Sequence, residues 1–163
     1  MFKEEKMSMM YFVGKHRFLL IAGCVLSGAS ALIMMCPFIL LWKVVEEVLK
    51  GIADVSKIDG EAVIKYGQWA VFSALIGFAV YFIALMCTHV AAFYTAFNMK
   101  SKALRYMSEL PLGYFIDNPS GKLRKIIDEN SKMTESFIAH LLPDLTGAVT
   151  TFAVMPVILL VFD

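Results

Sequence analysis

GQWAVFSALIGFAVYFIALMCTHVAAFYTAF, residues 67–97, contains no Asp, Glu, Lys or Arg. A helix that rises about 1.5 Å per residue crosses the roughly 30 Å hydrocarbon layer of a bilayer in about 20 residues, so this stretch is long enough to span it. Aromatic rings favour the two membrane–water interfaces, and here they gather at both ends of the stretch. The stretch therefore predicts a transmembrane helix. The aromatic residues are Tyr66 and Trp69 at one end and Phe93, Tyr94 and Phe97 at the other.

Two further uncharged runs flank this one, at residues 18–42 and 145–162. The first is long enough to cross, and Pro37 is expected to kink it. The second is near the minimum length, so its helix is expected to begin in the preceding segment. Asp144, at its start, is expected either to pair with a basic residue or to stay hydrated, and the second alternative is favoured. The sequence thus predicts an all-α, polytopic helical membrane protein with three transmembrane helices.

The composition agrees with a membrane protein. Apolar residues make up 59% of the 163 residues, against roughly 45–50% in an ordinary soluble domain. The formal net charge of +1 gives no basis for a nucleic-acid partner, so none is expected. A soluble enzyme is not expected, because a soluble core of this size would not need such long uncharged stretches. The lipid bilayer is the first partner that the sequence implies.

The positive charges predict the orientation. Lys and Arg favour cytoplasmic loops, and 11 of the 15 lie in the N-terminal segment or between the second and third spans. The N-terminus is therefore expected to be cytoplasmic, with an interfacial elbow at residues 1–17 and an outer loop at 43–66. This elbow includes the stretch Met7-Ser-Met-Met-Tyr-Phe12, flanked by Lys6 and Lys15.

A cytoplasmic helical hairpin is expected between the second and third spans. Apolar residues continue at helical spacing from residue 98 to 110 and again from 122 to 141, with a tip at 111–121 between them. Asn118 is the expected N-cap of the second arm, with Pro119 at its first position. Tyr114, Phe115 and Ile116 are bunched at the tip. They either form a docking surface for a partner or cap the hairpin's own core.

The sequence of this hairpin resembles a known family. Leu110-Pro111-Leu112-Gly113-Tyr114-Phe115, then Asn118-Pro119-Ser120-Gly121-Lys122-Leu123-Arg124 and Asp128, look like the first intracellular loop of ABC transporters with the exporter-type (type IV-like) transmembrane fold. Residues 141–145 and 157–163 are similar to the family's third helix. The branch that it most resembles holds siderophore transporters and multidrug-like half-transporters.

This resemblance implies the N-terminal half of a six-helix membrane domain, without a nucleotide-binding domain. The chain would then divide into an elbow at 1–17, a first transmembrane helix at 18–42 and a second at 67–97, which continues into the cytoplasm to residue 110. A coupling loop at 111–121 would follow, and then a cytoplasmic arm that leads into the third transmembrane helix, at 122–162. The tip would be the coupling helix that contacts a nucleotide-binding domain. The residues that carry this role are Gly113, Tyr114, Phe115, Ile116, Asp117, Asn118 and Pro119.

The resemblance also implies partners, cofactors and a location. The partners would be a nucleotide-binding domain, the remaining transmembrane helices and a second half-transporter, in a homodimer or a heterodimer. ATP and Mg would bind in the parent's nucleotide-binding domain and no cofactor in this chain, since Ile116 and Leu123 replace the first Gly and the Ser/Thr of a GxxxxGK[ST] phosphate loop. The location would be a bacterial cell membrane.

Other chemistry has little support in the sequence. No catalytic residue and no metal site is expected, because the His and Cys residues lack ligand spacing. His89 lies inside the second span, where a titratable group either lines a translocation path or packs between helices through a hydrogen bond.

Two other protein classes remain open. A complete three-span membrane protein would act as an assembly or regulatory partner of another transporter, although a complete protein would not be expected to stop at Asp163 on the outer membrane face. A small channel would require a polar stripe that the Ser and Thr residues do not make convincingly.

Overall fold

The computed structural model describes residues 9–51 and 58–162, without the side chains of residues 161 and 162. These residues form helices joined by short turns, with no strand among them. Three helical stretches, Met9–Lys50, Gly60–Ser108 and Ser120–Leu160, are long and apolar enough to cross a membrane. The predicted class, an all-α polytopic membrane protein, is confirmed. Of the Lys residues counted for the orientation, Lys3, Lys6 and Lys57 lie outside the described part, as do residues 1–8 of the elbow.

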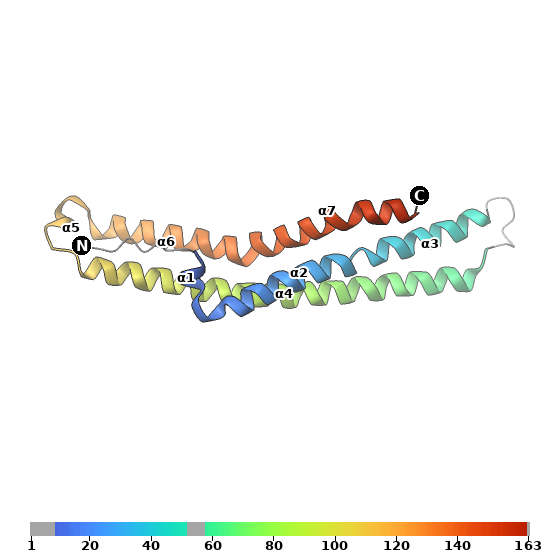
Figure 1. The fold of residues 1–163 in the computed structure, drawn as a ribbon, viewed down its shortest axis with the longest axis horizontal. Coiled ribbons are helices and arrows are strands. Elements are labelled where there is room, and N and C mark those ends of the chain that lie inside the picture. Colours follow the sequence, from blue (N-terminus) through green and yellow to red (C-terminus); the bar gives the residue numbers. More distant parts are fainter. Residues whose placement is uncertain (1–8, 52–57, 163) are drawn as a thin grey trace. The chain divides into compact units, whose positions relative to one another are not determined.

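The helices follow one another in a simple order, coloured from blue to red in Figure 1. The short α1 (Met9–Val13) and a 3-10 turn, η1 (Gly14–His16), precede α2 (Arg17–Ile33) and α3 (Cys36–Lys50). The long α4 (Gly60–Ser108) leads to α5 (Tyr114–Asp117). The last helical stretch is continuous and has three parts. They are α6 (Ser120–Ser136), the π-helical turn η3 (Phe137–Leu141) and α7 (Leu142–Phe162). Within the segment expected to be an outer loop, residues 43–50 belong to α3 and residues 60–66 to α4, so both parts are helical.

The first apolar stretch is broken between α2 and α3, next to Pro37. Because proline has no N–H, it cannot donate to the carbonyl of residue 33 and the regular hydrogen-bond ladder stops. The amide of Met35 bonds the Leu32 carbonyl at 3.1 Å instead, and the amide of Phe38 bonds the Met35 carbonyl at 3.1 Å. The expected kink is thus a local break at residues 34–35.

The described residues pack as two units. The described residues within 1–24 and 85–143 belong to the first unit, and those within 25–84 and 144–163 belong to the second. The first unit has a small apolar core in which α1 and the start of α2 meet α4 and η3. Its buried members are Val13, Leu20, Ala91, Ala92, Ile138 and Ala139.

The first unit also contains the hairpin arms. Residues 98–108 of α4 and the facing part of α6 lie side by side, with α5 in the turn that joins them (Figure 1). An ion pair of 3.1 Å between Lys100 and Asp128 links the arms. The returning arm begins at Ser120 with Pro119 at the N-cap position, and no side chain caps it. The expectation that Asn118 caps this helix was therefore wrong by one residue, because Pro119 takes the extended conformation at ψ 131°.

Small residues bring the helices of the second unit close together. A Cβ atom placed on Gly28 of α2 would lie 3.1 Å from Thr150 Oγ1 of α7, and one on Gly147 would lie 3.4 Å from Ser27 Oγ. Gly77 of α4 similarly faces Met34, next to the helix break. Helices in membranes associate through such small residues, because lipid supplies no hydrophobic driving force between them.

Candidate functional site

The candidate site from the sequence is the tip of the hairpin. Gly113 stands at the N-cap position of α5 and Asn118 at its C-cap position, so the four residues between them form one helical turn. Four backbone bonds form the turn, and the two shortest run from the amide of Tyr114 to the Pro111 carbonyl at 2.9 Å and from the amide of Phe115 to the Leu112 carbonyl at 3.0 Å. The side-chain amide of Asn118 closes it by donating to the Tyr114 carbonyl at 3.3 Å.

The side chains of the tip divide into two kinds. Tyr114 and Phe115 pack edge to face, with ring centroids 5.8 Å apart and planes at 90°, and Phe115 is half-buried. By contrast, Leu112 is 88% exposed and Ile116 is 83% exposed. The sequence left two interpretations of these apolar residues. Capping of the hairpin's own core fits the half-buried Phe115, whereas a docking surface for a partner fits the exposed Leu112 and Ile116.

The arms below the tip are rich in charge. Asp128 lies between Lys100 of the other arm and Arg124 of its own helix, at 3.1 Å and 3.8 Å. Two more pairs one helical turn apart, Arg105 with Glu109 and Lys125 with Glu129, have nitrogen–oxygen distances of 3.7 Å. All these side chains are exposed, so each pair stabilises the arms by about 1 kcal/mol at most. The apolar tip therefore stands on a polar, solvated support.

His89, the second candidate, is far from the tip along the chain. It lies on α4 about 28 Å before the end of that helix, at about 1.5 Å per residue. Its ring meets His140 of the π-helical turn edge to face, with centroids 4.8 Å apart and planes at 85°. Next to it, Thr88 is fully buried and its hydroxyl donates to the Ala139 carbonyl at 3.0 Å. The structure thus packs His89 against η3.

His140 is a neighbour of His89 that the sequence did not reveal. The two histidines are separated by about 50 residues of chain, and no motif links them. A π-helical turn is often found at functional sites, because it redirects side chains within an otherwise regular helix. Within the described ranges, no group of three His, Cys, Asp or Glu residues is placed to hold a metal ion.

Asp144 has an unexpected partner. Its carboxylate accepts a hydrogen bond of 2.6 Å from the hydroxyl of Tyr81 on α4, within the second unit. The sequence had suggested a basic partner or hydration alone, and neither alternative foresaw a phenol. Tyr81 lies in the middle of an uncharged stretch of helix, so its hydroxyl is a polar group that requires an acceptor there.

The fold and its spans define a polytopic helical membrane protein, and comparison with known proteins narrows the class. The chain is 27% identical over 147 residues to the mycobactin import ATP-binding/permease protein IrtA of Mycolicibacterium smegmatis, a match that covers 89% of this chain and 16% of that protein. It is 29% identical over 145 residues to the protein of the same name from Mycolicibacterium thermoresistibile, covering 88% and 15%. No family model and no solved structure matches the chain.

These matches make the chain similar to a part of two ATP-binding/permease proteins. Both relatives are much larger, and the chain spans about 16% and 15% of their lengths. Each relative's name combines a permease with ATP binding.

Proposed function

We propose that this chain is a membrane-spanning part of an ATP-driven ABC transporter of the exporter-type fold. It forms part of the solute path and couples to a nucleotide-binding domain through the tip of its cytoplasmic hairpin. The observation that carries the proposal is the exposed pair Leu112 and Ile116 at the end of a charged hairpin, in a chain similar to two ATP-binding/permease proteins.

The tip has the features of a docking element. Exposed apolar side chains on a solvated support mark partner surfaces, since they gain free energy when a partner removes them from water. Gly113, Asp117, Asn118 and Pro119 complete the surface around Tyr114, Phe115 and Ile116, and the ion pair between Lys100 and Asp128 adds a weak link between the arms that carry it. Movement of a docked domain would then be transmitted along α4 and α6 into the spans.

The remaining partners and cofactors follow from this proposal. ATP and Mg would bind in the nucleotide-binding domain, while this chain supplies the docking surface and part of the membrane path. The second half-transporter and the remaining helices would complete the membrane domain in a bacterial cell membrane, with the N-terminus cytoplasmic. His89, packed against His140, would lie along the solute path.

Photo-crosslinking tests the docking role directly. A photoreactive phenylalanine analogue at Ile116 is expected to crosslink, in native membranes, to a domain that contains a GxxxxGK[ST] phosphate loop. The matched control is the same analogue at Met133 of α6, which is also exposed, at 72%, but lies away from the tip. Mass spectrometry of the crosslinked peptide identifies the partner.

Two results would contradict the proposal. If Ile116 yields no more phosphate-loop peptide than Met133, the tip does not dock such a domain. If Ile116 instead crosslinks to a membrane protein without that loop, the chain acts as an assembly or regulatory partner. As a second measurement, Leu112→Asp and Ile116→Asp together are expected to reduce co-purification of the nucleotide-binding domain by about tenfold, because a carboxylate buried at an interface without a partner costs more than about 1.4 kcal/mol.

A further inference from the structure

The carboxylate of Asp144 stands at the beginning of the uncharged stretch of α7. It accepts a hydrogen bond from the hydroxyl of Tyr81, at 2.6 Å, and among the described side chains it forms no ion pair. The residue is exposed. Its partner Tyr81 lies in the middle of the uncharged stretch 67–97, and acidic side chains within membrane spans are costly and commonly mark the route of a ligand or ion. A hydrogen bond from a neutral phenol leaves the negative charge uncompensated.

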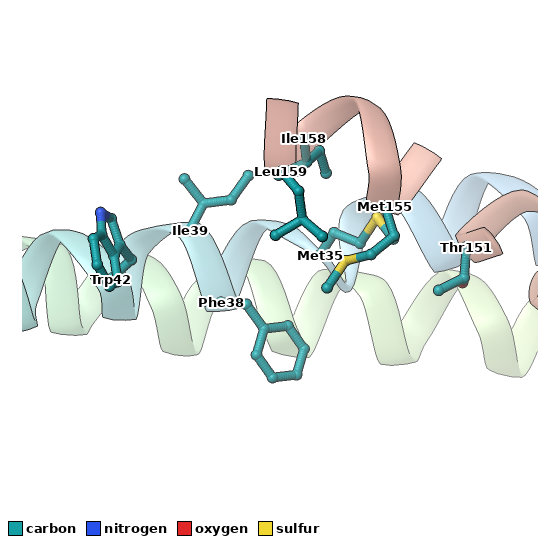
Figure 2. A pocket seen from close by; sticks show the side chains of 8 residues that line it. All are labelled: Met35, Phe38, Ile39, Trp42, Thr151, Met155, Ile158 and Leu159. Atoms are coloured by element: carbon teal, nitrogen blue, oxygen red, sulfur yellow. The ribbon is translucent and has the colours of Figure 1, made fainter. Parts of the chain in front are cut away.

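An apolar pocket of about 470 Å³ lies between α3 and α7 of the same unit. This volume is within the range of about 300–1,000 Å³ that is typical of small-molecule sites. Figure 2 shows the thioethers of Met35 and Met155 pointing toward one another across it, with Trp42 further along α3. Thioethers and aromatic rings adapt to varied apolar groups. On one side the pocket borders the break between α2 and α3. On the other side, Pro156 interrupts the backbone hydrogen bonds of α7.

The carboxylate and the pocket share one face of α7. Asp144, Ala148, Thr151 and Met155 recur at spacings of three or four residues, which places them in one line along a helix, and all four are exposed. Thr151 and Met155 line the pocket. Between Asp144 and the two pocket residues stands Ala148, whose small side chain does not block this face of α7. Seven residues of helix separate Asp144 from Thr151, a distance of about 10 Å along the axis. An uncovered stripe thus runs from an uncompensated negative charge to an apolar cavity.

We propose that this stripe binds an amphipathic organic cation, with its apolar part in the pocket and its cationic group on the Asp144 carboxylate. The charge decides the class of ligand, because an anion would meet repulsion at Asp144 and a neutral molecule would leave the carboxylate uncompensated. Tyr81 orients the carboxylate by donating to one of its oxygens. The inference that such cations are transported rests on the proposed transporter function. Their binding does not require a nucleotide-binding domain.

Quenching of Trp42 fluorescence measures the binding. The sequence has two tryptophans, so Trp69→Phe leaves Trp42 as the only reporter, in the wall of the pocket. The full chain is placed in neutral phosphatidylcholine vesicles and titrated with a bromododecyl trimethylammonium ion at submicellar concentration. The uncharged bromododecyl alcohol, with the same tail, measures what the tail alone contributes, through partition into the bilayer and occupation of the pocket.

The cation is expected to quench Trp42 at about tenfold lower concentration than the alcohol, a difference of about 1.4 kcal/mol. Asp144→Asn should remove that advantage and leave the alcohol curve unchanged, whereas Asp144→Glu should retain most of it. Tyr81→Phe should weaken cation binding by a smaller factor. Thr151→Phe, which adds bulk to the pocket without a new tryptophan, should weaken both ligands. Glu46→Gln removes a negative charge elsewhere in the same unit and serves as the control.

Two outcomes overturn the inference: equal quenching by cation and alcohol in the parent, or unchanged cation binding in a folded Asp144→Asn variant, with Tyr81→Phe taking its place if Asp144→Asn does not fold. Circular dichroism shows whether each variant is folded, and Tyr81→Phe keeps the test decisive if Asp144→Asn does not fold. Because the assay contains no nucleotide and no second domain, its failure leaves the docking proposal standing. Failure of crosslinking at Ile116 would likewise leave this binding site standing.

Discussion

The side-chain amide of Asn98 donates a hydrogen bond of 2.9 Å to the backbone carbonyl of Phe12, joining residues 86 positions apart. One turn earlier on α4, Tyr94 stacks on His16 with ring centroids 3.9 Å apart. One turn later, Lys102 lies 4.3 Å from the centre of the Tyr11 ring. Three successive turns of α4 thus hold the elbow, α1 and η1, in place on the first unit.

Asn98→Ala is expected to loosen the elbow, because it leaves the Phe12 carbonyl without its donor. The loss of one such bond costs about 1 kcal/mol, which corresponds to about fivefold faster hydrogen exchange of the local amides. Exchange of residues 9–16 in micelles, followed by mass spectrometry, measures this. Asn130→Ala is the control, because the Asn130 amide bonds within its own helix, to Ile126. Equal exchange in both variants would contradict the role given to Asn98.

Gly14→Ala is expected to destabilise the same elbow for a different reason. Gly14 has φ +56°, where a side chain costs about 1–2 kcal/mol because its Cβ approaches the following carbonyl oxygen. A titration with denaturing detergent, monitored by circular dichroism, should show unfolding of the variant at a lower fraction of detergent. Gly60→Ala is the control, since no atom lies within 4 Å of where its Cβ would stand and its φ is not positive. Unchanged unfolding of Gly14→Ala would show that the elbow accepts another backbone conformation.

Thr88→Val tests the link between α4 and the π-helical turn. The substitution keeps the shape of the buried side chain but removes the hydroxyl that donates to the Ala139 carbonyl. In a membrane such a bond contributes about 0.6–2 kcal/mol, so detergent unfolding should shift by that amount. Thr88→Ser retains the hydroxyl and is expected to stay closer to the parent. If Thr88→Ser and Thr88→Val lose the same stability, the loss comes from packing and not from the hydrogen bond.

Gly28→Ala tests the close approach of α2 and α7. Its new methyl would lie 3.1 Å from Thr150 Oγ1, and that hydroxyl is held by a bond of 2.8 Å to the Thr146 carbonyl. Overpacking of this kind costs about 1–3 kcal/mol and offsets the gain of roughly 1 kcal/mol from replacing a helical glycine. Gly121→Ala, with open space around its Cβ, should show that gain alone. The comparison is made by the same detergent titration.

The double variant Gly28→Ala, Thr150→Ala separates packing from helix propensity. Removing the threonine hydroxyl makes room for the new methyl, so the double variant should be more stable than the sum of the two single changes predicts. A coupling energy near zero would mean that Gly28 and Thr150 do not restrict each other.

The spans could be predicted from the sequence because they depend on local properties. Residues 67–97 hold no charge, and length and charge alone decide whether a helix suits a bilayer. The break near Pro37 and the turn after Leu110 were predictable for the same reason, since a missing N–H acts on its own neighbours. The tip residues, Gly113 to Pro119, are contiguous and so were also visible as a group.

The pairings were decided by tertiary structure alone. Tyr81 with Asp144, His89 with His140 and Asn98 with Phe12 each join residues about 50 or more positions apart. Hydropathy identifies which residues enter the membrane but carries no information on which helix faces meet. Those faces are chosen by close packing of small residues and by polar groups that must find a partner away from water. The sequence by itself therefore determined the number of spans and the exposed hairpin, whereas only the packed helices determined which polar side chains pair.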